Sequence, residues 1–464
     1  MPQTQTQSAR PGLLRQLGFF SATALVISNM VGTGIFATTG FMAGDLGSAA
    51  MIIACWTVGA FFAFAGALSY SELGVNFPSS GGEYVYLTQA FGPEWGFMTG
   101  WVSFFAGFSA PIAVTALAFT EYLSHFFPAL EQANTPIVIG SGILSLHLGP
   151  AQAVACGLIA LLTILNCLGV GLTAKVQNSL TTTKLCVIIA FVVFGLLFGA
   201  GSWSNFSQHI VRTSTASLPA QFVVSLLYVM FGYSGWNAAT YVAEEVRRPE
   251  RTLPAALAAG SALVAVLYLG LNIVYIYSTP LEQMKGVIKV GALSASNLFG
   301  PGIAGVFSAL MALSIIATVN AELTIGPRVY YAMAKNRAFF PSAGKVHARY
   351  HTPVIAILAQ GMCAMAMTLT SFRDLLTYIG MSLTIFTVLS VASLMVFRRN
   401  RPGWQRLRVI DFAYPLLPLA YIVVGAGMVI FGLILATRAS LTAFATVGAG
   451  ALVYRFTLRP RPHE

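Results

Sequence analysis

Two glycine-rich stretches interrupt long apolar runs in this sequence. Gly32, Thr33 and Gly34 stand in the middle of the first apolar run, and residues 231–237 (FGYSGWN) stand in the middle of the sixth. Because Gly costs about 1 kcal/mol in a helix interior relative to Ala, clustered glycines favour local unwinding. An unwound turn leaves backbone N–H groups free for an anion and carbonyls free for a cation. The two stretches therefore predict a binding site that needs no charged side chain.

Lys184 and Glu322 are ionisable residues well inside apolar runs. A charge at the centre of a bilayer costs about 3 kcal/mol or more, which indicates a functional role for both. Glu322 follows Thr318 by four residues, so these two share a helix face. If Thr318 faces Lys184, Glu322 can pair with the lysine and the pair can carry a proton. Two alternatives stay open: Lys184 extends to the membrane interface, and Glu322 reaches water or pairs with Arg328.

The composition predicts an all-α integral membrane protein. Of the 464 residues, 56% are hydrophobic and 8% are charged, whereas a soluble domain carries about 25% charged residues. Runs such as 416–436 have the length of roughly 20 apolar residues that crosses a bilayer.

We predict twelve transmembrane helices, near residues 17–43, 48–71, 94–123, 149–170, 178–201, 217–242, 253–278, 300–333, 352–371, 374–397, 410–436 and 438–457. The formal charge is +11, and most Lys and Arg residues fall in loops on the side of both termini. The positive-inside rule then makes residues 1–16 and 458–464 cytoplasmic tails, in a bacterial-type cytoplasmic (inner) membrane. This distribution of charge gives no support to nucleic-acid binding.

The two interrupted helices are the first and the sixth. This spacing is expected when two five-helix units of inverted topology each open with a broken helix. We assign the units to residues 17–201 and 217–397, followed by helices 11 and 12 in residues 410–457. The alternative is that the glycines only allow close helix packing.

Cysteine and histidine positions indicate no metal site. The cysteines lie in apolar segments without a CxxC spacing, and the histidines lie in predicted loops or the tail. The sequence also lacks a catalytic cluster such as HExxH. We predict no metal, no cofactor and no enzymatic activity.

Four acidic residues lie at predicted cytoplasmic helix ends, close in sequence or in topology to three arginines. The acids are Glu72, Glu83, Glu244 and Glu245, and the arginines are Arg247, Arg248 and Arg251. We expect ion pairs between the two groups that anchor loops, without contact to a ligand.

Several motifs resemble the amino acid–polyamine–organocation superfamily, and in particular its L-type amino acid transporter branch. They are residues 31–36 (VGTGIF), 71–74 (SELG), 78–84 (PSSGGEY), 176–178 (VQN) with Lys184, 231–245, and 328–331 (RVYY). The resemblance covers most of residues 18–402 and is weak in the last two helices. It implies a LeuT-type core and a secondary transporter that moves L-amino acids by alternating access.

The resemblance also implies roles in substrate binding. The N–H groups of Thr33 and Gly34, with the Thr33 hydroxyl, would bind the carboxylate of an amino acid, and backbone carbonyls would accept from its ammonium. Phe231 would cover the substrate, although from periodicity alone it would be a packing residue. The predicted substrate site comprises Met30, Gly32, Thr33, Gly34, Phe231, Ser234 and Asn237.

For coupling, the resemblance implies that Lys184 stands where related transporters hold a sodium ion. It would bridge the carbonyl of Gly32 and the hydroxyl of Thr318, which predicts sodium-independent transport. Glu322 departs from the family pattern and adds the possible proton site, so exchange and proton symport both stay open. Since neither break contains an acid, a neutral amino acid is the favoured substrate. The alternatives are a transporter of cationic amino acids or polyamines, and an amino-acid sensor on a transporter fold.

Partners are predicted to be few. Animal relatives of this branch join a heavy chain through a cysteine after the third helix, and residues 124–148 contain no cysteine. The resemblance therefore implies no disulfide-linked heavy chain. Besides the amino acid and the lipid bilayer, we expect a monomer or a weak homo-oligomer.

Overall fold

The computed structural model describes residues 15, 17–78, 81–134, 137–139, 146–168, 171–350 and 352–458. The side chains of residues 171–181 lie outside this description, and so do both predicted tails apart from Arg15 and residue 458. The motif at 176–178 and residues 79–80 of the motif at 78–84 therefore fall wholly or partly outside the described residues.

The chain is almost entirely helical. The first part contains α1 (Phe19–Met30), α2 (Gly34–Ala37), α3 (Thr39–Leu46), α4 (Ala49–Asn76), α5 (Glu83–Phe91), α6 (Pro93–Val102), the π-helix η1 (Ser103–Ser109), α7 (Ala110–Leu123), α8 (Pro150–Leu168) and α9 (Gly171–Phe198). The second part contains α10 (Leu218–Gly232), the 3₁₀-helix η6 (Ala238–Glu245), α11 (Pro249–Ser278), α12 (Leu281–Met284), α13 (Val290–Phe299), α14 (Pro301–Lys335), α15 (Val354–Met367) and α16 (Phe372–Asn400). The chain continues through α17 (Arg408–Asp411), α18 (Leu416–Leu435), α19 (Thr437–Val453) and η8 (Tyr454–Leu458).

The predicted loops contain short elements of their own. Between α7 and α8, the strands β1 (Ile137–Ile139) and β2 (Leu146–Leu148) pair antiparallel, with Val138 opposite His147. The remaining short helices are η2 (Pro128–Leu130), η3 (Gln132–Asn134), η5 (Trp203–Ser207) and η7 (Pro341–Gly344).

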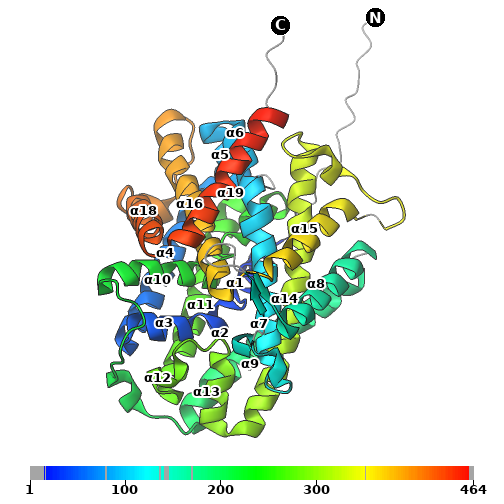
Figure 1. The fold of residues 1–464 in the computed structure, drawn as a ribbon. Coiled ribbons are helices and arrows are strands. Elements are labelled where there is room, and N and C mark those ends of the chain that lie inside the picture. Colours follow the sequence, from blue (N-terminus) through cyan, green and yellow to red (C-terminus); the bar gives the residue numbers. More distant parts are fainter. Residues whose placement is uncertain are drawn as a thin grey trace, which may run out of the picture.

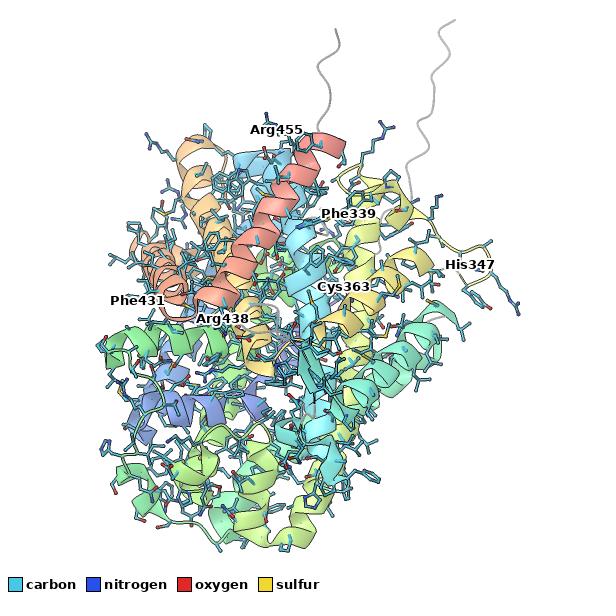
Figure 2. The ribbon with its side chains drawn as sticks, in the orientation of Figure 1. Phe339, His347, Cys363, Phe431, Arg438 and Arg455 are labelled. Carbon is cyan, nitrogen blue, oxygen red and sulfur yellow. The ribbon has the colours of Figure 1, made fainter. Side chains whose placement is uncertain are left out.

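Nine helical stretches of the described chain are long and apolar enough to cross a membrane. Large apolar side chains point outward from several of them, for example Leu161 on α8, Val423 on α18 and Phe444 on α19. Such exposed apolar surface is stable in contact with lipid. In Figure 2, Arg438 and Arg455 lie near the two ends of the last of these stretches, which runs from Thr437 to Thr457.

One local motif occurs once in each half of the chain. α5 ends at Phe91 and α13 ends at Phe299, and Gly-Pro follows in both places. Gly92 has φ 103° and Gly300 has φ 88°, a region that L side chains rarely adopt, and the next residue, a proline, begins a long helix. α5 lies at the top of Figure 1 and α13 at the bottom, so the same turn is built on opposite sides. This is the relationship expected between inverted repeats.

The helices at the centre of the bundle pack through small residues. α4 and α1 pack against α11, α7 packs against α14, and α10 packs against α16. At the contact of α10 with α16, a Cβ on Gly380 would lie 2.3 Å from the carbonyl oxygen of Leu227. Close backbone approach of this kind is typical of helix packing in membranes.

Candidate functional site

The first helix is broken where the sequence predicted it. α1 ends at Met30, and Val31 leaves the helical region with φ −75° and ψ 82°. The helix resumes at Gly34 as α2 and continues through Thr38, which has helical angles, into α3. The first N–H groups of α2 have no preceding helical turn to bond and point into the break.

The sixth predicted span is broken as well. α10 ends at Gly232, residues 233–237 form turns, and the chain continues as the 3₁₀-helix η6. Gly235 has φ 92°, a conformation that favours glycine. The carbonyl of Phe231 accepts hydrogen bonds from the N–H of Ser234 at 3.1 Å and from its hydroxyl at 2.8 Å.

The two breaks touch through their glycines. A Cβ on Gly34 would lie 2.4 Å from the Cα of Gly232, and a Cβ on Gly235 would lie 2.7 Å from the carbonyl oxygen of Asn29. The glycines therefore permit both unwinding and close backbone contact, and the alternative that they only allow close packing is wrong. Phe231 lies against this contact and is 6% exposed.

The carbonyls expected to receive an ammonium group have partners in this structure. The carbonyl of Met30 accepts from the hydroxyl of Tyr268 on α11 at 2.6 Å and from the N–H of Gly32 at 2.8 Å. That of Phe231 is bonded by Ser234, as described above. The carbonyl of Ser234 receives no hydrogen bond among the described residues. An ammonium bound to the carbonyl of Met30 or of Phe231 would therefore displace the donors already bonded to that carbonyl, or share the carbonyl with them.

Side chains from other helices complete the site. The hydroxyl of Thr33 lies 3.3 Å from that of Thr115 on α7. Asn237 donates a hydrogen bond of 3.0 Å to Oε1 of Glu83 on α5. Thr115, Tyr268 and Glu83 were not predicted as site residues because the sequence gives no signal for which residues of distant helices face a break.

Lys184 connects the first break to α14. Its ammonium donates to the carbonyl of Val31 at 2.5 Å and to the hydroxyl of Thr318 at 3.2 Å. The predicted bridge from Lys184 to the first break and to α14 is present, but the carbonyl that accepts the hydrogen bond belongs to Val31 and not to Gly32. Lys184 is 5% exposed, so the alternative that its side chain extends to the membrane interface is wrong.

Glu322 lies one helical turn beyond Thr318 on α14. No salt bridge joins it to Lys184 or to Arg328 among the described residues. Arg328 instead donates to the carbonyl of Thr324. One carboxylate oxygen of Glu322, Oε2, is buried without a hydrogen-bond partner.

The prediction that Glu72 and Glu83 form ion pairs with Arg247, Arg248 or Arg251 is wrong. Glu72 bonds Arg398 on α16 in a bidentate pair at 2.7 Å, and it bonds none of the arginines near residue 250. Glu83 accepts from the hydroxyl of Tyr70 at 2.8 Å in addition to Asn237. Both carboxyl groups are buried.

On the side of the molecule with α12 and α13, an ion pair joins α16 to the first broken helix. Arg373 at the start of α16 bonds Asp45 on α3 at 2.5 Å and donates to the hydroxyl of Tyr228 on α10 at 3.0 Å. The pair ties both broken helices to α16. A cavity of about 410 Å³ lies beside it, lined by Arg373, Lys285 and Glu121 among others.

A second cavity, of about 280 Å³, lies between α1, η6 and α14. Asn29 and Ala238, next to the two breaks, line its inner part, and Tyr84 on α5 and Asn336 beyond the end of α14 also line it. α5 and α6 lie at the top of Figure 1, and η8, the last described helix, lies on the same side. This cavity therefore approaches the breaks from the side of α5 and η8.

Comparison with known proteins gives this arrangement a family. The model of the family described as "Amino acid permease" matches residues 17–455. The chain belongs to this family. Within the amino acid–polyamine–organocation superfamily, the chain is thus a multi-pass membrane transporter and not an enzyme.

The curated relatives of this chain are amino acid transporters and exchangers. The serine/threonine exchanger SteT of Bacillus subtilis is 27% identical over 413 residues, which cover 88% of this chain and 89% of the relative. The human large neutral amino acids transporter small subunit 2 is 27% identical over 446 residues, covering 93% and 78%. The human cystine/glutamate transporter is 29% identical over 398 residues, covering 85% and 76%. Amino acid transport is the activity that these family relatives share.

Proposed function

We propose that this chain is a sodium-independent secondary transporter of neutral L-amino acids that works by alternating access. The observation that carries the proposal is the contact between two broken helices, Gly34 against Gly232, with polar backbone groups and no charged side chain in either break. A zwitterion needs donors for its carboxylate and acceptors for its ammonium in one small space. Half-helix termini at mid-membrane supply both.

The proposed architecture has twelve transmembrane helices in a LeuT-type arrangement. The nine candidate spans are supplemented by α9, by α15 and by the broken pair α10 and η6. Residues 17–201 and 217–397 form the two inverted five-helix repeats, and α18 and α19 follow them. The repeated Phe-Gly-Pro turn after α5 and α13 supports this division.

The structure fits an inward-facing state of such a transporter. The cavity of about 280 Å³ approaches the breaks from the side of α5 and η8, and the Asp45–Arg373 pair joins α3 to α16 on the opposite side. If α5 and η8 are on the cytoplasmic side, as the distribution of Lys and Arg predicts, the open side faces the cytoplasm of a bacterial-type cell. Substrate would then leave past Asn29 and Ala238 in this state.

Within this proposal, Thr33 and Gly34 bind the substrate carboxylate, and the carbonyls of Met30, Phe231 and Ser234 accept from the ammonium. The ammonium of the substrate would compete with the hydroxyl of Tyr268 for the carbonyl of Met30.

The ammonium of Lys184 takes the place of a sodium ion between the first break and α14. Because this charge is built into the chain, transport needs no sodium gradient. Glu322 is positioned to add a proton site, which would convert exchange into proton symport.

Reconstitution into liposomes tests the proposal. We expect uptake of at least one labelled neutral amino acid, from a panel of L-serine, L-threonine, L-leucine and L-cystine, into liposomes loaded with the same amino acid. Replacing sodium with choline or potassium should leave the rate unchanged. The chain should do this without a disulfide-linked partner, since residues 124–148 contain no cysteine.

Three outcomes would contradict parts of the proposal. A requirement for sodium would disprove the role of Lys184. Uptake of L-arginine or putrescine alone would assign a cationic substrate. A thermal shift with an amino acid in detergent, without any flux in liposomes, would indicate a sensor.

A further inference from the structure

Glu83 is a buried carboxyl group that faces the second break from α5. It is 6% exposed, and its Oε1 accepts both from the hydroxyl of Tyr70 at 2.8 Å and from Nδ2 of Asn237 at 3.0 Å. Asn237 also donates to the hydroxyl of Tyr241 at 3.3 Å. The other oxygen of the carboxyl group, Oε2, makes no hydrogen bond with the described residues and is free to take a proton.

Asn237 links this carboxyl group to the path of the chain through the break. It precedes η6 directly, and its carbonyl accepts from the N–H of Thr240 at 2.9 Å and from the Thr240 hydroxyl at 2.7 Å. The side chain of Asn237 thus fixes the point where η6 begins. The carboxyl group of Glu83 fixes that side chain in turn.

No cation in the part of the chain that the structure describes compensates the charge of Glu83. It forms no ion pair among the described residues, and the titratable groups that interact with it are tyrosines: Tyr70 on α4, Tyr86 on α5, Tyr241 on η6 and Tyr421 on α18. The charged residues on the packed elements α16 and α6 are engaged elsewhere or exposed: Arg398 with Glu72 and Asp411, Arg401 with Gln89, and Glu94 facing outward.

Burial therefore raises the pKa of Glu83 from 4.5 to about 7, although the hydrogen bonds from Tyr70 and Asn237 lower it. A cavity comes close to this group. Gly81, Tyr84, Ala238 and Tyr241, which are neighbours of Glu83 and Asn237 in the chain, line the cavity on the side of α5 and η8. A proton from that side can reach the carboxyl group when the cavity is open.

We propose that Glu83 is a proton-responsive positioning residue of the substrate site, which holds Asn237 and the start of η6 as a carboxylate and loosens them as a neutral acid. The inference rests on the proposed function, because Asn237 belongs to the proposed substrate site. Hydrogen bonds to a charged acceptor are roughly twice as strong as those to a neutral one. One proton taken from water on Oε2 weakens both bonds to Oε1 and leaves the fold intact. Acid on the side of α5 and η8 then favours release of substrate there.

The experiment measures KM against pH in proteoliposomes with equal pH on both sides, using whichever of L-serine, L-leucine and L-arginine is transported fastest. In the unmodified protein, KM should rise about threefold or more between pH 8 and pH 6. Glu83→Gln, a neutral side chain of the same shape, should give one KM at both pH values, close to that of the unmodified protein at pH 6. Glu94→Gln, which removes an exposed carboxyl group from α6, should keep the original profile.

A second variant guards against failure of Glu83→Gln to fold. Tyr70→Phe removes one donor that stabilises the carboxylate, so the rise in KM should begin at a higher pH. An unshifted profile in Tyr70→Phe, or a pH dependence that persists in Glu83→Gln and disappears in Glu322→Gln, would overturn the inference. A flat profile in the unmodified protein would overturn it as well. If the unmodified protein transports none of L-serine, L-threonine, L-leucine and L-cystine, the proposed function itself fails.

Discussion

The ammonium of Lys184 lies 2.5 Å from the carbonyl oxygen of Val31 and 3.2 Å from the hydroxyl oxygen of Thr318. One side chain on α9 thus holds the unwound part of the first helix at a fixed distance from α14. The lysine is 5% exposed, so its charge is stabilised by these polar atoms and by the nearby Glu322 and not by bulk water.

Lys184→Met should therefore abolish most transport. The substitution keeps most of the length of the side chain but leaves the carbonyl of Val31 without its donor, a loss of about 1–3 kcal/mol that corresponds to roughly 5- to 150-fold in rate. Initial rates in proteoliposomes measure this effect. Lys335→Met, at the exposed end of α14, is the matched control and should keep the original rate. Equal rates in both variants would show that Lys184 does not organise the first helix.

The positions of the two breaks could be predicted because clustered glycines are a local signal. The exact partner of Lys184 could not, because the carbonyls of Val31 and Gly32 differ only in how the unwound turn is oriented. Tyr268 and Thr115 were missed for a related reason: their contacts with the first break depend on how α11 and α7 are rotated.

The buried carboxyl groups show the same limit. The sequence predicts that Glu83 pairs with an arginine at a helix end, and only the fold shows that its partner is Asn237.

The contact between the two breaks can be tested with one methyl group. Gly34→Ala would place a Cβ 2.4 Å from the Cα and 2.9 Å from the N of Gly232. Both are backbone atoms, which cannot move easily. The free energy of unfolding should fall by about 1–3 kcal/mol, which is typical of overpacking, and the melting temperature in detergent should fall with it. Gly32→Ala is the control two residues away: its nearest neighbour would be the carbonyl of Met30 at 3.9 Å, so its melting temperature should change little. A larger loss in the control than in Gly34→Ala would show that the breaks are further apart.

The pair of Asp45 and Arg373 should behave as a closed gate on the side of α12 and α13. Asp45 is buried, so Arg373→Met leaves its charge without a partner and should destabilise the inward-facing state by about 3 kcal/mol. In the double variant Asp45→Asn, Arg373→Met the uncompensated charge is gone, and part of the stability should return.

Accessibility of the outer cavity provides the second readout for this gate. A cysteine in place of Ser371, which lines the cavity of about 410 Å³, should react faster with a membrane-impermeant maleimide when Arg373 is replaced. Arg438→Met, on α19, removes an arginine without an ion pair among the described residues and should leave the labelling rate unchanged. Identical labelling in all variants would mean that the pair does not control access.

The bidentate pair of Glu72 and Arg398 should contribute to stability without affecting substrate affinity. The carboxylate of Glu72 accepts four hydrogen bonds: two from Arg398, one from the indole of Trp404 at 2.7 Å and one from the N–H of Leu407 at 2.9 Å. Glu72→Gln turns one acceptor into a donor that faces other donors. Because the side chain is fully buried, the free energy of unfolding should fall by about 3 kcal/mol, with Asp411 still compensating Arg398.

The control for this variant is Glu282→Gln. Glu282 pairs with Lys285 at 3.5 Å, but its side chain is 65% exposed, and pairs of this kind contribute about 0–1 kcal/mol. Its melting temperature should stay within a degree or two of the original, whereas that of Glu72→Gln should fall well below it. The amount of folded Glu72→Gln should drop while KM of the folded fraction is unchanged, because no contact of Glu72 reaches either break. A raised KM in that fraction would instead connect the end of α4 to the substrate site.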